Sequence, residues 1–310
     1  MLGGSAASAA PAWPTQPVHM VVGYPPGTSP DMVARLIAEP LARSLGQPVV
    51  IDNKPGAGGN LGVELVVNSK GGHTFGITTN GPLTTAKQLY ANLPYDPIKD
   101  IVPLSLAATS PLVLATSTAV PAASITEFLA YGRSRPQGLL YGSIGNGSGS
   151  HLTMELFASK TALRVVQVPY QGYPQVATAL VGHEIETAFM APSGALVQAD
   201  AGKLKMLGIS SAERSPLIPA LPTIAEAAGL PGFRAELWVA AFAPAGMPPD
   251  IANRLSAEIN GILKLPELQE KLMQQGWTAA GGPPEMLGRR IAEDTTLWGQ
   301  VIAQANVHLD

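Results

Sequence analysis

Residues 18–31, VHMVVGYPPGTSPD, carry the pattern that decides the fold. The apolar run Val18–Val22 has the length of a buried strand and ends in turn residues, Gly23 to Gly27. The segment Ser29-Pro30-Asp31 then offers a polar cap, a first-turn proline and an acidic residue, which together predict the start of a helix. A strand that leads directly into a helix is the repeating unit of α/β proteins.

The same alternation continues along the chain and predicts the α/β class. Pro40 lies inside the pattern of the first helix, where we expect a kink or a break. Beyond Pro248 the pattern predicts helices alone. Further strands are expected at 48–52, 74–79, 111–116, 139–143, 165–168, 185–190, 204–210 and 237–242.

Length and composition indicate a folded chain of two lobes. The chain has 310 residues, of which 46% are hydrophobic and 13% charged, with 33 glycines and 29 prolines. The formal net charge of -3 comes from interspersed signs without a basic stripe, so nucleic acid is not an expected partner. Zero cysteines exclude disulfides and thiolate metal sites.

The order of the strands predicts how the lobes are divided. We expect the chain to cross near Val113 and to return near Leu237, giving a two-stranded hinge with a ligand cleft between two α/β lobes. Lobe one then comprises 13–113 plus 237–310, and lobe two comprises 114–236. Residues 1–12, MLGGSAASAAPA, are interpreted as a signal-peptide remnant or a disordered tail.

Two loops run from a strand end into a helix start, Tyr24 to Asp31 and Ser143 to His151. A helix N-terminus carries partial positive charge and unpaired N–H groups, so two facing termini would grip a carboxylate without a lysine or an arginine. The alternative is that both are ordinary tight turns, in which glycine and serine serve geometry alone. Tyr24, Tyr170, Tyr173 and Trp238 could wall a ligand or belong to the core.

The sequence gives weaker support for an enzyme than for a binding protein. The glycine-rich runs lack the spacing of a dinucleotide fingerprint. A hydrolase-like α/β enzyme using a serine of the 143–150 loop remains an alternative, although Tyr141 stands where a nucleophile elbow needs glycine. The five histidines are scattered without metal-ligand spacing. We therefore expect no catalytic residue, no metal and no cofactor.

Nine segments, in order, resemble one family, the Bug-type solute receptors of tripartite tricarboxylate transporters, over nearly the whole chain. They are Tyr24-Pro25-Pro26-Gly27 with Asp31, LGQPVV at 45–50, NKPGAGGN at 53–60, LPYDP at 93–97, Tyr141 to Leu152, VPYQG at 168–172, AGKL at 201–204, LPT at 221–223 and APAG at 243–246.

This resemblance implies a type II periplasmic binding fold that closes on a small carboxylate. It also implies a periplasmic address, a monomer, and the membrane permease subunits of a tripartite transporter as partners. A ligand sensor for a signalling partner remains an alternative output. The ligand-binding residues implied are Tyr24, Pro26, Gly27, Thr28, Thr79, Asn80, Ser143, Gly145, Asn146, Gly147, Ser150, Tyr170 and Gly172.

The chain departs from the family pattern at three places. Thr28 stands where a second glycine is usual, Met190-Ala191-Pro192 replaces a polar ligand contact, and Ala86-Lys87 replaces Asn-Pro. These departures suggest a less polar distal pocket. The cargo is expected to be a small carboxylate such as an aromatic or dicarboxylic acid. The three departures favour an aromatic or otherwise apolar-bodied acid over an amino acid or citrate.

Overall fold

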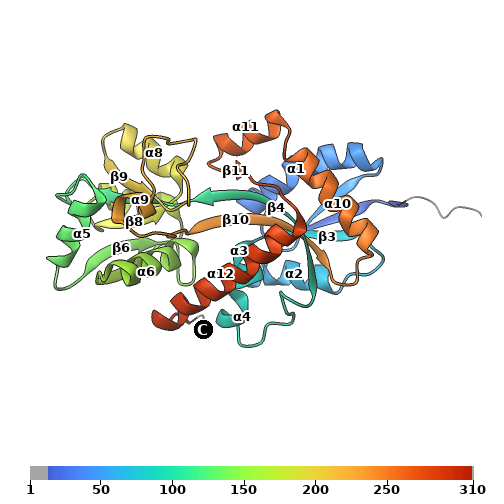
Figure 1. The fold of residues 1–310 in the computed structure, drawn as a ribbon, viewed down its shortest axis with the longest axis horizontal. Helices are drawn as coiled ribbons and strands as arrows, with labels where there is room; N and C mark the ends of the chain where they lie inside the picture. The colour runs from blue at the N-terminus through green and yellow to red at the C-terminus, as the bar shows by residue number, and fades with distance from the viewer. Residues whose placement is uncertain (1–12, 309–310) are drawn as a thin grey trace, which may run out of the picture.

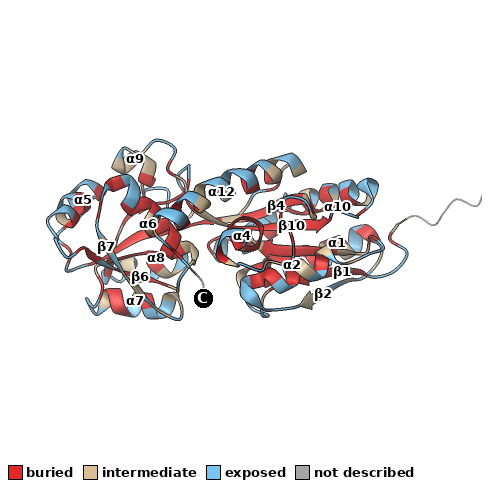
Figure 2. Ribbon diagram, turned by 90° about the horizontal axis from the view of Figure 1, so that it is seen from below, coloured by how far each residue is buried: buried red, intermediate tan, exposed pale blue. Residues whose placement is uncertain are grey.

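The computed structural model describes residues 13–308, which form two lobes side by side (Figure 1). Residues 1–12, interpreted above as a signal-peptide remnant or tail, lie outside the described residues. Each lobe is built around one sheet, and helices cover both faces of each sheet. Buried residues gather in the strands and on the inward faces of the helices (Figure 2), so each lobe has a core of its own.

Lobe one contains a six-stranded sheet in the order β11-β4-β10-β3-β1-β2. Its strands are β1 (Val18–Val22), β2 (Val49–Asn53), β3 (Thr74–Thr79), β4 (Ile101–Pro111), β10 (Glu236–Pro244) and β11 (Thr278–Ala279). Its helices are α1 (Ser29–Leu45), the 3-10 turn η1 (Ala57–Gly59), α2 (Asn60–Val67), α3 (Asn80–Thr84), α4 (Ala86–Leu89), α10 (Pro249–Ile262), α11 (Pro266–Gln274) and the first half of α12 (Pro284–Gln304).

Lobe two contains a five-stranded sheet in the order β7-β6-β8-β5-β9. Its strands are β5 (Val113–Ser117), β6 (Leu139–Ser143), β7 (Val165–Pro169), β8 (Thr187–Met190) and β9 (Leu204–Ile209). Its helices are α5 (Ile125–Arg133), α6 (Gly149–Thr161), α7 (Tyr173–Val181), α8 (Pro192–Asp200) and α9 (Ile224–Ala228).

The sheets are mixed rather than purely parallel. β1 pairs in parallel with β2 and β3, and β6 pairs in parallel with β7 and β8. β10 is antiparallel to both β3 and β4, and β5 is antiparallel to both β8 and β9. β10 and β5 enter their sheets from the other lobe without a crossover helix. The parallel orientation of the two strands in a βαβ unit therefore does not apply to them.

Three local predictions were wrong. α1 runs unbroken through Pro40, because Ile37 and Leu41 on either side of it are fully buried in the core of lobe one. The chain beyond Pro248 is not helical throughout, since the short strand β11 pairs with β4. The strand expected at 111–116 is β5 (Val113–Ser117), and β4 (Ile101–Pro111), which ends just before it, was not expected from the sequence.

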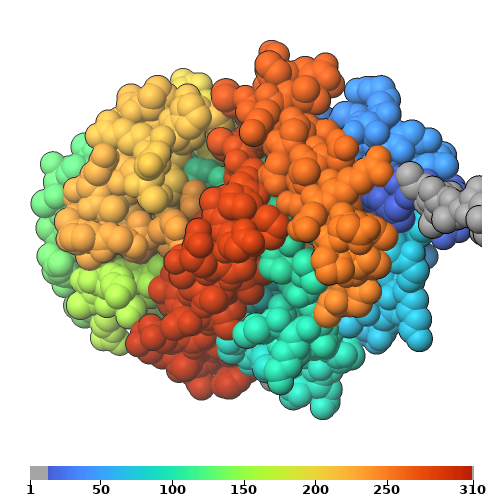
Figure 3. Space-filling model, turned by 45° about the vertical axis from the view of Figure 1, so that its right-hand side comes forward, coloured from blue at the N-terminus to red at the C-terminus, as the bar shows by residue number. Residues whose placement is uncertain are grey.

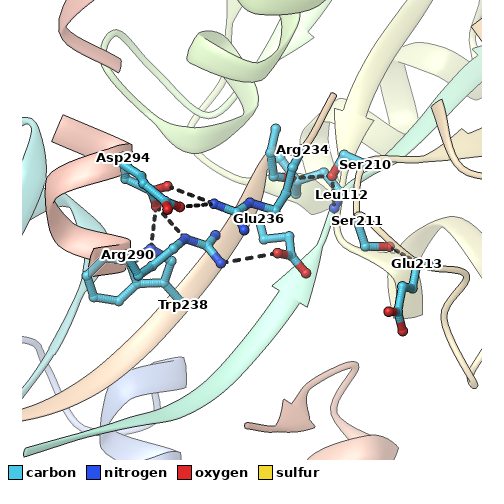
Figure 4. A network of polar contacts seen from close by, with 11 residues as sticks. Leu112, Ser210, Ser211, Glu213, Arg234, Glu236, Trp238, Arg290 and Asp294 are labelled. Carbon is cyan, nitrogen blue, oxygen red and sulfur yellow. Dashed lines mark hydrogen bonds and ion pairs between the residues drawn. The ribbon is translucent and has the colours of Figure 1, made fainter. Parts of the chain in front are cut away.

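The connection between the lobes is braced by Ser210 (Figure 4). The Leu112 N–H donates to Ser210 Oγ at 2.8 Å, and the Ser210 N–H donates to the Leu112 carbonyl at 2.8 Å. Ser210 Oγ in turn donates to the carbonyl of Ala235, whose N–H returns to the Ser210 carbonyl at 2.9 Å. A single buried serine therefore ties together the two chain segments that pass between the lobes.

Helix α12 contributes to both lobes. Leu287 and Ile291 pack in the lobe-one core, whereas Trp298, Val301 and Ile302 pack in the lobe-two core. In the space-filling view the helix, in red, lies across the junction of the lobes (Figure 3). The helix is therefore a third physical link between the lobes, beside the two strand crossings.

Candidate functional site

A cleft of about 560 Å³ opens between the lobes. Lobe one lines it with residues from the ends of β1 and β3, and lobe two lines it with the start of α6. The residues that line the cleft are Tyr24, Thr28, Ser29, Pro30, Gly58, Thr79, Asn80, Gly81, Thr85, Ile144, Gly147, Ser148, Gly149, Leu152, Thr153, Glu236, Leu237, Trp277 and Trp298.

The N-terminus of α1 reaches the cleft through Thr28 and Ser29. Thr28 is the N-cap in an extended conformation, and Pro30 occupies the first turn. Among the described residues, the N–H groups of Ser29 and Asp31 have no protein acceptor. These are the unpaired donors that a helix start offers to an anion.

Asp31 holds the loop before α1 in place. Its side chain is 2% exposed and accepts hydrogen bonds from the Gly27 N–H at 2.8 Å, from Asn53 at 2.9 Å and from Arg35 at 2.8 Å and 3.0 Å. Burial opposes ionisation, but the hydrogen bonds from Arg35, Gly27 and Asn53 outweigh it and lower the pKa of the Asp31 carboxyl. The Gly27 N–H is therefore occupied within the protein.

Tyr24 is fixed at the edge of the cleft by two hydrogen bonds. Its hydroxyl donates to the Gly58 carbonyl at 2.8 Å and lies 2.6 Å from Thr79 Oγ1. Burial raises the pKa of the Tyr24 phenol to about 12, despite hydrogen bonds from threonine side chains that lower it. A Cβ on Gly59 would lie 2.6 Å from Tyr24 Cζ, so glycine is required there for this close approach.

The N-terminus of α6 faces the cleft from lobe two. Ser148 is the N-cap and accepts from the His151 N–H at 3.3 Å, while its hydroxyl donates to the Gly145 carbonyl at 2.7 Å. The N–H groups of Gly149 and Ser150 have no protein acceptor within residues 13–308. The first turn contains no acidic residue.

His151 orients this loop from behind. Its Nδ1 accepts from the Gly147 N–H at 3.0 Å, and its ring stacks on Tyr141 with centroids 6.5 Å apart. Burial lowers the pKa of His151, against the attraction of Glu155. Because Nδ1 accepts from the Gly147 N–H, the neutral imidazole has its one acceptor nitrogen occupied within the loop.

Five of the residues implied by the resemblance line the cleft together: Tyr24, Thr28, Thr79, Asn80 and Gly147. Others brace the loops. Ser143 Oγ accepts from the Gly145 N–H at 3.2 Å and from Gln167 at 2.7 Å, and Ser150 Oγ accepts from the Ile144 N–H at 3.1 Å. The cleft lining as described does not include Pro26, Gly27, Asn146, Tyr170 or Gly172.

Sequence reasoning missed the part of the lining that comes from the C-terminal third. Trp277 precedes β11 and Trp298 lies on α12, and both reach the cleft with Glu236 and Leu237 of β10. Trp238, considered above as a residue that could line the ligand site, is instead fully buried. Its Nε1 donates to Asp294 at 2.7 Å (Figure 4). No local pattern distinguishes a core tryptophan from a cleft tryptophan, because both are apolar residues at helical or strand spacing.

The arrangement offers binding groups rather than catalytic ones. The hydroxyls of Ser148 and Ser150 lie 3.1 Å apart and belong to the loop network, and His151 Nδ1 is occupied by Gly147. No group of three or more metal-ligating side chains occurs among residues 13–308. Within the same range, no helix combines the length and apolar character needed to cross a bilayer.

Comparisons with known proteins agree with this geometry. The sequence model of the tripartite tricarboxylate transporter family receptors matches residues 33–307. Protein BugT of Bordetella pertussis is 33% identical over 309 residues, which is 99% of this chain and 94% of BugT. A Rhodopseudomonas palustris protein solved with adipate is 33% identical, with a TM-score of 0.78 over 96% of this chain and 100% of that one. MatC of the same organism, with bound malate, is 31% identical, with a TM-score of 0.74 over 94% of this chain and 100% of MatC.

Proposed function

Because this chain belongs to the receptor family of tripartite tricarboxylate transporters, we propose that it captures a small carboxylate by closing its lobes and delivers it to membrane permease subunits. The family consists of solute-binding receptors and not of enzymes. The working location that fits this role is the periplasm, with the receptor acting as a monomer.

One observation carries the proposal: two helix N-termini with unpaired N–H groups meet at one cleft. Of the unpaired N–H groups, those of Ser29 at the start of α1 and Gly149 at the start of α6 belong to residues that line the cleft. A carboxylate placed between them would receive charge-assisted hydrogen bonds without a basic side chain. The Asn80 amide would add a side-chain contact from lobe one, whereas the Tyr24 and Thr28 hydroxyls donate within the protein, to the carbonyls of Gly58 and Pro25.

Closure of the two lobes around the ligand supplies the binding affinity. We place lobe one at 13–113 plus 237–310 and lobe two at 114–236, with the hinge where Ser210 joins Leu112 to Ala235. Because α12 packs on both cores, closure also shifts or repacks its last turns against one lobe. The ligand can shift the open-to-closed equilibrium only by its extra affinity for the closed form.

The relatives indicate the size of the cargo. Adipate and malate, bound by the two Rhodopseudomonas palustris proteins, are small organic acids. We infer a carboxylate of similar size for this chain, held at one end by the helix N-termini.

A thermal-shift screen tests this proposal. The purified chain is partly unfolded and refolded to strip any bound cargo, and is then titrated with aliphatic, aromatic and amino acids. A rise in melting temperature with one class of these carboxylic acids, with the compound recovered unchanged, is the expected result. Turnover of an ester substrate that is lost in Ser148→Ala or Ser150→Ala would instead support a hydrolase. The absence of any carboxylate shift would overturn the receptor function.

A further inference from the structure

The charged groups of the cleft are few and of one sign. Of the 19 residues that line it, one carries a formal charge, and that residue is Glu236 at the start of β10. The described lining contains no lysine, arginine or histidine. A ligand in this cleft therefore meets a fixed negative charge and no fixed positive one.

The carboxylate of Glu236 is only partly neutralised by its neighbours (Figure 4). Arg290 lies 3.3 Å from it but is closer to Asp294, at 2.9 Å. Arg234 contacts Glu293 at 3.0 Å and Asp294 at 3.8 Å. Three carboxylates thus share two guanidinium groups, which leaves one net negative charge in this cluster. Both guanidinium groups lie outside the described cleft lining, so neither is placed to receive an anionic ligand group.

Besides Glu236, the cleft lining includes apolar side chains. Leu237 follows Glu236 on β10, and Trp277 and Trp298 come from the C-terminal segment. Leu152 and Ile144 add aliphatic surface from lobe two. Trp298 Nε1 is buried without a hydrogen-bond partner in the described structure, so it presents no accessible donor to an anion. A charged group against these apolar side chains would lose water, and the described lining offers it no basic side chain as a partner.

We propose that the cargo is a monocarboxylate with an uncharged apolar or aromatic body, and that Glu236 is a specificity residue that rejects dicarboxylates. This inference rests on the proposed function, in which the helix N-termini hold one carboxylate. The body of the acid then lies against Leu237, Trp277 and Trp298. A second carboxylate would be desolvated beside these residues and repelled by Glu236, since like charges interact strongly at low effective dielectric.

Acids that differ only at their far end provide the test. Hexanoate and adipate form one pair, and 3-phenylpropionate and its 4-carboxy derivative form another. In calorimetric titrations of the stripped protein, we expect the monocarboxylate of at least one pair to bind tenfold or more tightly than its dicarboxylate. This comparison uses the unaltered chain, so it does not depend on a variant that folds.

A variant of Glu236 tests whether this residue causes the selectivity for monocarboxylates over dicarboxylates. Glu236→Gln keeps an acceptor for Arg290 and removes the charge, and we expect it to narrow the ratio of monocarboxylate to dicarboxylate affinity by about tenfold. Glu39→Gln, which alters an exposed glutamate on α1, serves as the matched control and leaves the ratio unchanged. An unchanged ratio in Glu236→Gln would overturn the role of this residue.

The outcomes separate this inference from the function on which it rests. Equal or tighter binding of the dicarboxylates in both pairs would overturn the inference and leave the receptor function standing. Failure of every acid to bind, in the pairs and in the wider screen, would overturn both.

Discussion

Helices α1 and α6 present their N-termini to the same cleft, but different chemistry braces the two loops. The loop before α1 is held by the buried carboxylate of Asp31, which takes the Gly27 N–H and stands in the first helical turn. The loop before α6 is held by serine hydroxyls and the neutral ring of His151, with no acidic residue in its first turn.

This difference gives the two helix ends unequal electrostatic roles. A negative charge in the first turn offsets the positive end of the helix dipole, so the start of α1 attracts an anion less strongly than the start of α6. Pro30 removes one further N–H donor from α1. We infer that the start of α6 is the main binding site of the carboxylate, and that lobe one contributes mainly amide contacts.

The largest effect is expected at the Asp31 brace. Asp31→Asn places an amide N–H₂ among the donors of Gly27, Asn53 and Arg35, and we expect a loss of about 2–3 kcal/mol in the free energy of unfolding. Urea denaturation measures it. The control is Asp52→Asn, which alters a partly exposed carboxylate paired with His19, for which a change within about 0.5 kcal/mol is expected. Equal losses in the two variants would contradict the bracing role.

The same brace predicts a pH dependence. The pKa of Asp31 is lowered in the folded state, so its contribution is fully present above the usual value of 3.8. That contribution is lost as the pH falls through the folded-state pKa. Between pH 6 and pH 3 the unfolding free energy should therefore decrease more in the parent chain than in Asp31→Asn.

A smaller effect is expected where α6 meets the hinge. A Cβ on Gly149 would overlap Leu237 Cδ2, so Gly149→Ala pushes the helix start away from β10. We expect ligand affinity to fall about tenfold, or ~1.4 kcal/mol. Gly81→Ala is the control, because it also lines the cleft but its Cβ would meet only Thr85 Oγ1, at 3.9 Å. If the affinity losses of Gly149→Ala and Leu237→Ala are simply additive in the double variant, the steric explanation is wrong.

The smallest effect concerns His151. Phenylalanine at 151 can stack on Tyr141 but cannot accept from the Gly147 N–H, so His151→Phe should weaken ligand binding about fivefold, or ~1 kcal/mol. Asparagine offers an acceptor oxygen in a similar place, so His151→Asn should lose less. Equal losses in the two variants, measured by calorimetry, would show that the acceptor does not matter.

Acidification should also destabilise the folded chain through His151. The folded-state pKa of His151 is lowered by burial, so the stabilisation from its neutral form is complete above about 6.5 and is lost as the pH falls below that value. Glu155, 3.9 Å away, and Tyr141 face the ring. The unfolding free energy of the parent chain should fall between pH 7.5 and pH 5 more than that of His151→Asn.

Local patterns predicted much of the fold because strands and helix starts have local causes. The apolar run at Val18–Val22, the proline in the first turn of α1 and the serine before α6 each act within a few residues. The family resemblance added the closing cleft. Missed elements depend on distant partners: β11 has two residues and exists because it pairs with β4.

The chain itself therefore determines the α/β units, the two glycine- and serine-rich loops and the absence of a basic ligand clamp in them, because these follow from residues close together in sequence. The tertiary structure alone decided which side chains share the cleft. Trp277, Trp298 and Glu236 meet Tyr24 and Gly149 there only because β10 and α12 return across the lobe junction. Burial and pairing of that kind depend on contacts between segments more than eighty residues apart, which no local periodicity encodes.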